Sequence, residues 1–349
     1  IYMSNRITYI DTIKGIAIIL VVMGHALGFI LPEGKITVIT TGISEYGHEG
    51  QMATIVWKII YSFHMPLFMF CSGIFAISGI WEKLRNGLGK YIKRLIIPYI
   101  TTGFLCLWSR DHFGYWYLLS LFEFIFLANI AMLLASNISK QHKTFLYISI
   151  NVFVWASFQL LYLRVGNTCL ELSRYFVLYP FFILGTLIRP QIKRCDRILK
   201  NEIVICFSAV CFVLLEASIY YYPIAKDIFA NALINSLIDK IRIFGIPFLA
   251  ILLIMYLAKY KMPQLTKINK SLSYVGERTL QIYILHNLCV PPYGWVLEYF
   301  MKAGTAINSI TLQIFYSSFI TIYALVFSLS VGWVIKQNKY LNLLLFGKL

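Results

Sequence analysis

Long segments that are apolar on every side restrict this chain more than any other feature. Residues 16–22 read IAIILVV and residues 251–257 read ILLIMYL, with no polar face in either. Such segments suit membrane-spanning helices, which satisfy their backbone hydrogen bonds internally. Hydrophobic residues make up 59% of the 349 residues and charged residues 13%, which excludes an ordinary soluble protein. Because these segments do not alternate apolar and polar residues, a transmembrane β-barrel is excluded as well.

Apolar segments predict the number of membrane spans. Each crossing needs about 20 residues, so about ten spans with short loops use the whole length. The sequence therefore predicts a single integral-membrane domain over residues 1–349, folded as an all-α polytopic helical bundle. Pro98, Pro180 and Pro247 predict kinks or broken ends in three spans. The predicted spans lie near residues 12–31, 57–79, 95–109, 114–136, 144–163, 175–188, 202–221, 242–258, 272–291 and 309–335.

The distribution of Lys and Arg predicts the orientation of these spans. With both ends of the chain in the cytoplasm, 21 of the 31 basic residues fall in cytoplasmic segments and 7 in the opposite loops. Basic loops stay on the cytoplasmic side of the membrane. This placement accounts for most of the formal net charge of +16, so we expect no nucleic-acid partner. We expect a multi-pass protein of the cytoplasmic (inner) membrane, in contact with its lipids.

Cysteine usage and short motifs narrow the chemistry. The 7 cysteines lie mostly in apolar segments and form no CxxC pair, so we expect neither a disulfide framework nor a metal site. The sequence contains no GxSxG and no P-loop motif. A serine-esterase mechanism and nucleotide binding by a P-loop therefore have no support.

Polar side chains inside the predicted spans mark a candidate site, because such groups are costly in lipid. The spacing of Lys14 and His25 brings both to one helix face, about 16 Å apart along the axis. His64 in the second span and His286 in the ninth are each expected about 9 Å below the outer surface. His286 also shares a polar stripe with Tyr283. The sequence therefore predicts histidines from three helices at similar depth.

Several segments, in order along the chain, closely resemble the family-3 membrane acyltransferases, and the sugar O-acetylase branch most of all. The segments are 6–27 (RITYIDTIKGIAIILVVMGHAL), 61–75 (YSFHMPLFMFCSGIF), 93–99 (KRLIIPY), 115–122 (YWYLLSLF) and 280–286 (LQIYILH). They span nearly the whole chain. The resemblance implies a helical membrane enzyme that transfers an acyl group, usually acetyl from acetyl-CoA, to hydroxyls of extracytoplasmic glycans.

The family's hallmark is an Arg followed by ten residues and a His that is taken as the catalytic base. This chain keeps the spacing with Lys14 in place of the Arg, and the resemblance implies that His25 is the base. Lys retains the positive charge but not the planar fork of Arg. A second family pattern, two arginines three residues apart, is only partly kept, with Tyr91 and Arg94. An imidazole suits removal of a hydroxyl proton near neutral pH.

These considerations assign candidate roles. We predict His25 and His64 as catalytic residues. Acetyl-CoA, the expected donor substrate, needs cations for its phosphates. The predicted donor-binding residues are Lys14, Lys83, Arg85, Lys90, Lys93 and Arg94. The predicted residues for the acceptor, a glycan or lipid-linked sugar, are Asp11, Trp116, Glu123, Arg278, Tyr283 and His286.

Most of these residues also have a structural interpretation. Asp11 suits a helix start, where it can pair with the lysine one turn later. The basic loop 83–94 is also a topology signal that contacts anionic lipid. Trp116 fits an interfacial aromatic belt. His64 and His286 fit core histidines whose hydrogen bonds are satisfied within the bundle.

Other functions remain open at the level of the sequence. Succinyl transfer by a member of the same family would use the same residues. A transporter or flippase for lipid-linked sugars would also place polar groups in its spans, although such proteins commonly show internal repeats and this chain shows none. A sensor or structural subunit would have no need of the spacing between Lys14 and His25.

The predicted orientation can be tested by labelling single cysteines. A cysteine at Lys302 should react with a membrane-impermeant reagent added from outside, because its loop is predicted to be extracytoplasmic. Cysteines at Arg197 and Lys336 should react only after the membrane is opened. Labelling of the Arg197 cysteine in intact cells would overturn the orientation.

Overall fold

The fold is known from a computed structural model that describes residues 8–28, 54–76, 89–109, 115–139, 141–166, 172–225, 232–290 and 295–348. These residues form helices and their connections and contain no strand, which confirms the predicted all-α class. The chain divides into two compact units. The first comprises residues 1–67 and 197–330, and the second comprises residues 68–196 and 331–349. Each unit is described by itself.

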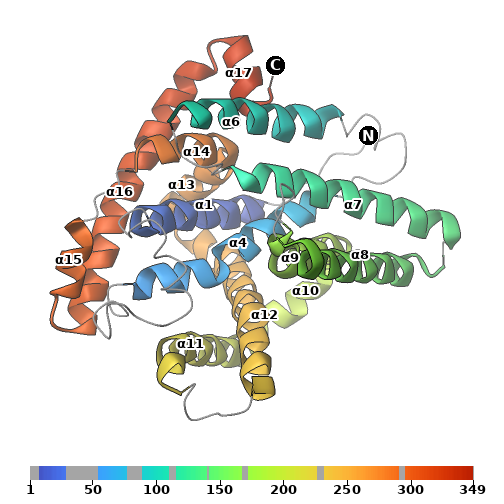
Figure 1. Ribbon diagram of the computed structural model, residues 1–349, viewed down its shortest axis with the longest axis horizontal. Coiled ribbons are helices and arrows are strands. Elements are labelled where there is room, and N and C mark those ends of the chain that lie inside the picture. Colours follow the sequence, from blue (N-terminus) through green and yellow to red (C-terminus); the bar gives the residue numbers. More distant parts are fainter. Residues whose placement is uncertain are drawn as a thin grey trace. The chain divides into compact units, whose positions relative to one another are not determined.

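The first unit holds the N-terminal helix and most of the C-terminal half of the chain (Figure 1). Its elements are α1 (Thr8–Gly28), the first half of α4 (Ile55–Ala76), α11 (Glu202–Ala225), α12 (Ala232–Tyr256), the π-helix η3 (Leu257–Lys261), η4 (Met262–Gln264), α13 (Thr266–Gly276), α14 (Thr279–Leu285), η5 (His286–Leu288), α15 (Trp295–Met301) and most of α16 (Ala306–Ile335).

The second unit holds the middle of the chain and its C-terminal end. Its elements are the second half of α4, the π-helix η1 (Ile92–Ile96), α6 (Ile97–Ser109), α7 (Trp116–Ile138), α8 (Lys143–Val165), α9 (Ser173–Ile188), η2 (Arg189–Gln191), α10 (Ile192–Leu199), which reaches the division, and α17 (Lys339–Phe346).

Within the described residues, 7 helical stretches are long and apolar enough to cross a membrane. They are residues 8–28, 55–76, 116–138, 143–165, 173–199, 234–264 and 306–335. A multi-pass membrane protein is therefore confirmed. The predicted sixth span, 175–188, corresponds to α9, and the helical stretch continues from it through η2 into the polar α10. The other predicted spans, 95–109, 202–221 and 272–291, correspond to α6, α11 and the α13–α14 segment, so the total of ten stays a prediction.

The predicted span at 272–291 is not one uninterrupted helix. α13 ends at Gly276, Glu277 and Arg278 form a turn, and α14 then runs for only 7 residues. A helix end leaves carbonyl groups without helical partners. Arg278 supplies one, since its Nη1 donates to the Tyr274 carbonyl at 3.0 Å. Its guanidinium also lies 3.5 Å from the centre of the Tyr274 ring. A hydropathy pattern does not detect such an interruption.

α1 packs directly on α13 (Figure 1). A Cβ atom placed on Gly15 would overlap the Leu272 carbonyl oxygen, and one on Gly276 would overlap the Asp11 carbonyl oxygen, so the two backbones are in contact. Glycine permits this approach, as in tightly packed membrane helices. Near the start of both helices Thr12 donates to Asn269 at 2.7 Å, and further along His25 of α1 meets His286 after α14, so the two segments run parallel.

The C-terminal half of α1 packs on the first half of α4. A Cβ on Gly24 would lie 2.9 Å from Cε2 of Tyr61, and one on Gly28 would lie 3.2 Å from Nε1 of Trp57. Trp57 is 3% exposed and belongs to a buried apolar cluster with Leu27, Val56, Ile60, Val296, Leu297 and Phe300. These contacts fix α4 beside the end of α1 that carries His25.

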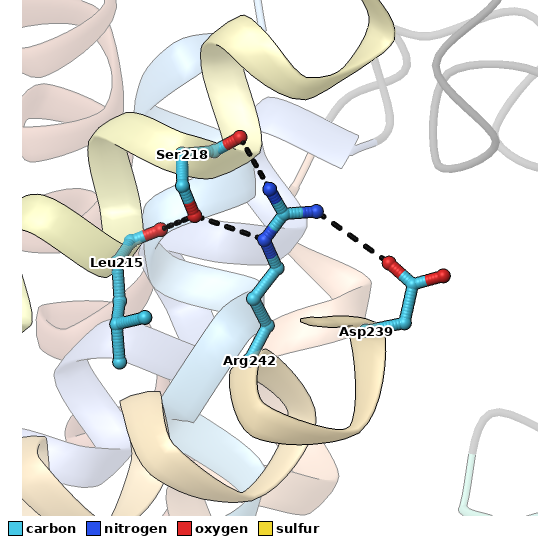
Figure 2. A network of polar contacts seen from close by, with 4 residues as sticks. All are labelled: Leu215, Ser218, Asp239 and Arg242. Carbon is cyan, nitrogen blue, oxygen red and sulfur yellow. Dashed lines mark hydrogen bonds and ion pairs between the residues drawn. The ribbon is translucent and has the colours of Figure 1, made fainter. Parts of the chain in front are cut away.

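Polar contacts join the remaining helices of the first unit. Figure 2 shows Arg242 of α12 reaching Ser218 of α11, where Nε donates to Oγ at 2.9 Å and Nη2 to the carbonyl oxygen at 2.8 Å. Asp239 lies 3.5 Å from the same guanidinium. On α16, Gln313 accepts from the Val56 amide at 3.1 Å, while the Ser328 carbonyl accepts from Gln281 of α14 at 2.7 Å.

The second unit is also held together by glycine-mediated backbone contacts and by hydrogen bonds between helices. A Cβ on Gly73 would overlap the Phe182 carbonyl oxygen, so α4 and α9 touch through their backbones. Tyr179 of α9 donates to Asn151 of α8 at 2.6 Å. A Cβ on Gly347, whose φ is +62°, would overlap the Lys93 carbonyl oxygen, so the chain after α17 lies against η1.

The contact between α1 and α13 leads to a stability prediction. Gly276→Ala adds a methyl group that only a backbone shift can accommodate, and overpacking of this kind typically costs about 1–3 kcal/mol. We expect a lower unfolding temperature of the detergent-solubilised protein, followed by intrinsic fluorescence. Gly89→Ala is the control, since a Cβ there meets no atom within 4 Å. If Gly276→Ala and Gly89→Ala had the same melting temperature, the α1–α13 contact would accommodate the added methyl group without loss of stability.

Candidate active site

His25 and His286 are in direct contact. His25 Nδ1 and His286 Nε2 lie 2.6 Å apart, and the two rings are inclined by only 6°. His25 stands near the C-terminal end of α1, and His286 follows α14 directly. Because α1 and the α13–α14 segment run parallel in contact, these two positions lie side by side. The sequence prediction that they occur at similar depth is confirmed by this contact.

His286 is held on both sides. It is 0% exposed, and its Nδ1 lies 3.0 Å from the carbonyl oxygen of Ile282, one turn earlier. The ring of Tyr283, which is also buried, lies 6.0 Å from that of His286. The imidazole therefore has a fixed place and orientation.

His64 belongs to the same unit. It is buried on α4, and its Nδ1 lies 2.8 Å from the Ile60 carbonyl oxygen. A carbonyl only accepts, so Nδ1–H donates and Nε2 carries the lone pair of the neutral ring. The ring of Tyr61 lies edge-on to that of His64 at 4.7 Å and packs against α1 beside His25. Tyr61 therefore connects His64 with the part of α1 that carries His25.

Two further residues of this unit, Tyr61 and Glu216, were not among the predicted site residues. Glu216 is a carboxylate within the apolar helix α11, and it accepts a hydrogen bond from Ser62 Oγ at 2.5 Å. A carboxylate within a membrane span is costly, and this alone could have indicated Glu216 as a candidate from the sequence. Tyr61 gave no such signal, because its role depends on a contact between helices.

Lys14 and Asp11 form an ion pair at the other end of α1. Lys14 Nζ lies 3.9 Å from Asp11 Oδ1, and the side chains are 24% and 12% exposed. The structural interpretation of Asp11 as the partner of Lys14 is therefore observed. Lys14 is separated from His25 by about 16 Å of helix.

Arg278 is engaged close to its own position in the chain. Besides the Tyr274 contacts, its Nη1 lies 3.6 Å from the Glu277 carboxylate. Its guanidinium closes the interruption between α13 and α14. Its predicted contact with the acceptor stays a prediction.

The remaining predicted residues belong to the second unit, apart from two that lie outside the described residues, Lys83 and Arg85. The Arg174 guanidinium stacks over Trp116 at 3.4 Å, so one face of the indole is covered. Glu123 accepts from Tyr175 at 3.0 Å. Three basic residues are exposed in η1 or just before it: Lys90, Lys93 and Arg94. This exposure suits contact with phosphates, of a donor or of lipid.

In the parts of the chain that the structure describes, no group of three or more His, Cys, Asp or Glu side chains has the arrangement of a metal site. The histidine pair is joined by a hydrogen bond between its ring nitrogens, which leaves each ring engaged with the other. The arrangement suits proton transfer by a positioned imidazole.

Comparison with known proteins places this geometry in context. Residues 7–114 match the acyltransferase domain family, a region that includes His25 and His64 but ends before His286. The nodulation protein NolL of Sinorhizobium fredii is 26% identical over 238 residues, which are 60% of this chain and 58% of that protein. NolL of Mesorhizobium japonicum is 32% identical over 96 residues, 27% of this chain and 22% of that protein. The chain thus matches less than two thirds of either relative. No solved structure matches.

Proposed function

We propose that this chain is a membrane acyltransferase that transfers an acyl group to a hydroxyl of an extracytoplasmic glycan. Its apolar helices, the match of residues 7–114 to the acyltransferase domain family and the similarity to NolL support the proposal. The donor is acetyl-CoA from the cytoplasm, and the acceptor is a capsule, an exopolysaccharide or a lipid-linked sugar. The observation that carries the proposal is the histidine pair, because it equips the family-matched helix α1 with an oriented imidazole.

His25 is the general base of the proposed reaction. It removes the proton of the acceptor hydroxyl as the hydroxyl oxygen attacks the thioester carbonyl. The carbon–sulfur bond then breaks, and the same proton passes from His25 to the departing thiolate to give free coenzyme A. His64 assists from α4, where Nε2 can accept a hydrogen bond from the acceptor.

The donor enters from the cytoplasmic side in this proposal. Lys14 stands at the inner end of α1, and the exposed Lys90, Lys93 and Arg94 are suited to phosphates. The pantetheine arm extends along α1 from Lys14 towards His25. The reacting groups then meet within the membrane, and intact acetyl-CoA need not cross it.

Contact with the acceptor is assigned to Tyr283, whose ring lies beside the histidine pair, and acceptor binding by Trp116 stays a separate proposal. Aromatic faces are suited to the apolar faces of sugars. For Asp11, Glu123 and Arg278 the observed partners are protein groups, and acceptor binding by these residues remains a proposal.

Transfer can be measured with purified protein, radiolabelled acetyl-CoA and the native glycan. We expect His25→Ala to abolish transfer without unfolding the protein, since a positioned general base contributes about 10²–10⁴-fold in rate. His142→Ala is the matched control, because His142 is exposed before α8 and has no assigned role. Wild-type turnover by a folded His25→Ala protein would remove His25 from the mechanism. Movement of the glycan across the membrane without incorporation of label would favour a flippase.

Lys14 gives a separate prediction about the donor. Lys14→Ala should raise the KM for acetyl-CoA more than the KM for the glycan, and Lys14→Arg should retain much of the activity. Lys302→Ala is the control, since Lys302 pairs with Glu298 at an exposed site of the same unit. If Lys14 serves only as the partner of Asp11, the melting temperature should fall while both KM values stay unchanged.

A further inference from the structure

We infer that His286 is a positioning residue that fixes the proton of His25 on Nδ1 and thereby leaves the lone pair on Nε2, the nitrogen that acts as base. The inference rests on the proposed function of His25. It assigns His286 a role different from the acceptor binding that the sequence suggested.

The proton positions follow from the Ile282 carbonyl oxygen. A carbonyl oxygen accepts hydrogen bonds and never donates, so the His286 nitrogen that faces it, Nδ1 at 3.0 Å, must carry a proton. A neutral imidazole has one donor and one acceptor nitrogen. The lone pair of neutral His286 is therefore on Nε2.

The short contact between the two rings then determines which nitrogen of His25 carries the proton. At 2.6 Å, one of the two nitrogens must donate to the other. Since His286 Nε2 accepts, His25 Nδ1 donates, and the lone pair of neutral His25 is on Nε2. The opposite arrangement would require a charged His286 in a fully buried, apolar place, which is costly.

Both ring nitrogens of His286 are occupied by protein groups. Nδ1 is bound by the Ile282 carbonyl and Nε2 by His25. No nitrogen of His286 is left to bind a sugar hydroxyl, so His286 acts on the reaction through His25. The Ile282 carbonyl cannot take a proton, so the positive charge that arises when His25 Nε2 is protonated stays within the histidine pair until the thiolate accepts a proton.

The proton position can be observed directly. Full-length protein labelled with ¹⁵N-histidine in lipid nanodiscs gives nitrogen shifts that separate protonated from unprotonated ring nitrogens, and His25→Gln identifies the His25 signals. We expect Nδ1 of His25 to be protonated and Nε2 unprotonated at neutral pH in the wild type. In His286→Leu, which lacks the acceptor, we expect Nε2 to become protonated. Wild-type shifts in His286→Leu would overturn the inference.

Kinetics of the same variants measure the consequence. His286→Leu should lower kcat by about 10²-fold or more, with the KM values for acetyl-CoA and glycan within about twofold of wild type, because His286 touches neither substrate. His286→Gln should regain part of kcat. Its amide can donate to the Ile282 carbonyl, as Asn129 and Asn151 do to carbonyls one turn earlier, and its oxygen then accepts from His25.

Gln281→Leu separates positioning from stability. It removes the bond from α14 to the Ser328 carbonyl and should lower the melting temperature while the His25 shifts remain as in the wild type. A raised glycan KM in His286→Leu with unchanged kcat would support acceptor binding and overturn the inference.

The outcomes also separate the inference from the proposed function. If the wild type transfers no acyl group, the proposed function fails while the shifts still report the tautomer. If transfer depends on His25 and not on His286, the inference alone fails.

Discussion

The backbone contact between α1 and α13 is the constraint on which the candidate site depends. Gly15 and Gly276 let the two helices approach without intervening side chains, and the parallel course then carries α14 along the second half of α1. The 2.6 Å separation of His25 and His286 is the result at the far end of that contact. A side chain between the helices would separate the histidines beyond hydrogen-bond distance.

Hydrogen bonds and glycine contacts hold the first unit together in a manner suited to lipid. Apolar burial gives membrane helices little reason to associate, because lipid tails are as apolar as leucine. The polar links described here, such as Ser62 with Glu216, Arg242 with Ser218 and Gln281 with Ser328, supply specific pairings between helices. These pairings fix the helices of the first unit relative to one another.

The sequence was sufficient for the fold class and for part of the site. Uninterrupted apolar runs predicted the all-α membrane fold, and helix phase with depth placed His25 and His286 at one level. The interruption at Glu277 and Arg278 was missed, because hydropathy does not register a guanidinium that folds back on Tyr274.

Roles that depend on contacts between helices were also beyond the sequence. Tyr61 and Glu216 acquire partners only when α1, α4 and α11 are assembled. The orientation of His286 likewise follows from one carbonyl group and one ring nitrogen, neither of which a motif specifies.

In the proposed reaction the base is oriented by a second neutral imidazole, and this bears on the stability of the bound thioester. In proteases with a Ser-His-Asp triad the orienting group is a carboxylate, which keeps a permanent negative charge in the site. A neutral pair carries no net charge between turnovers, so it does not draw water or counter-ions into the apolar interior. Positive charge then arises on the imidazole only while an acceptor hydroxyl is reacting, and a donor waiting without an acceptor is protected from hydrolysis.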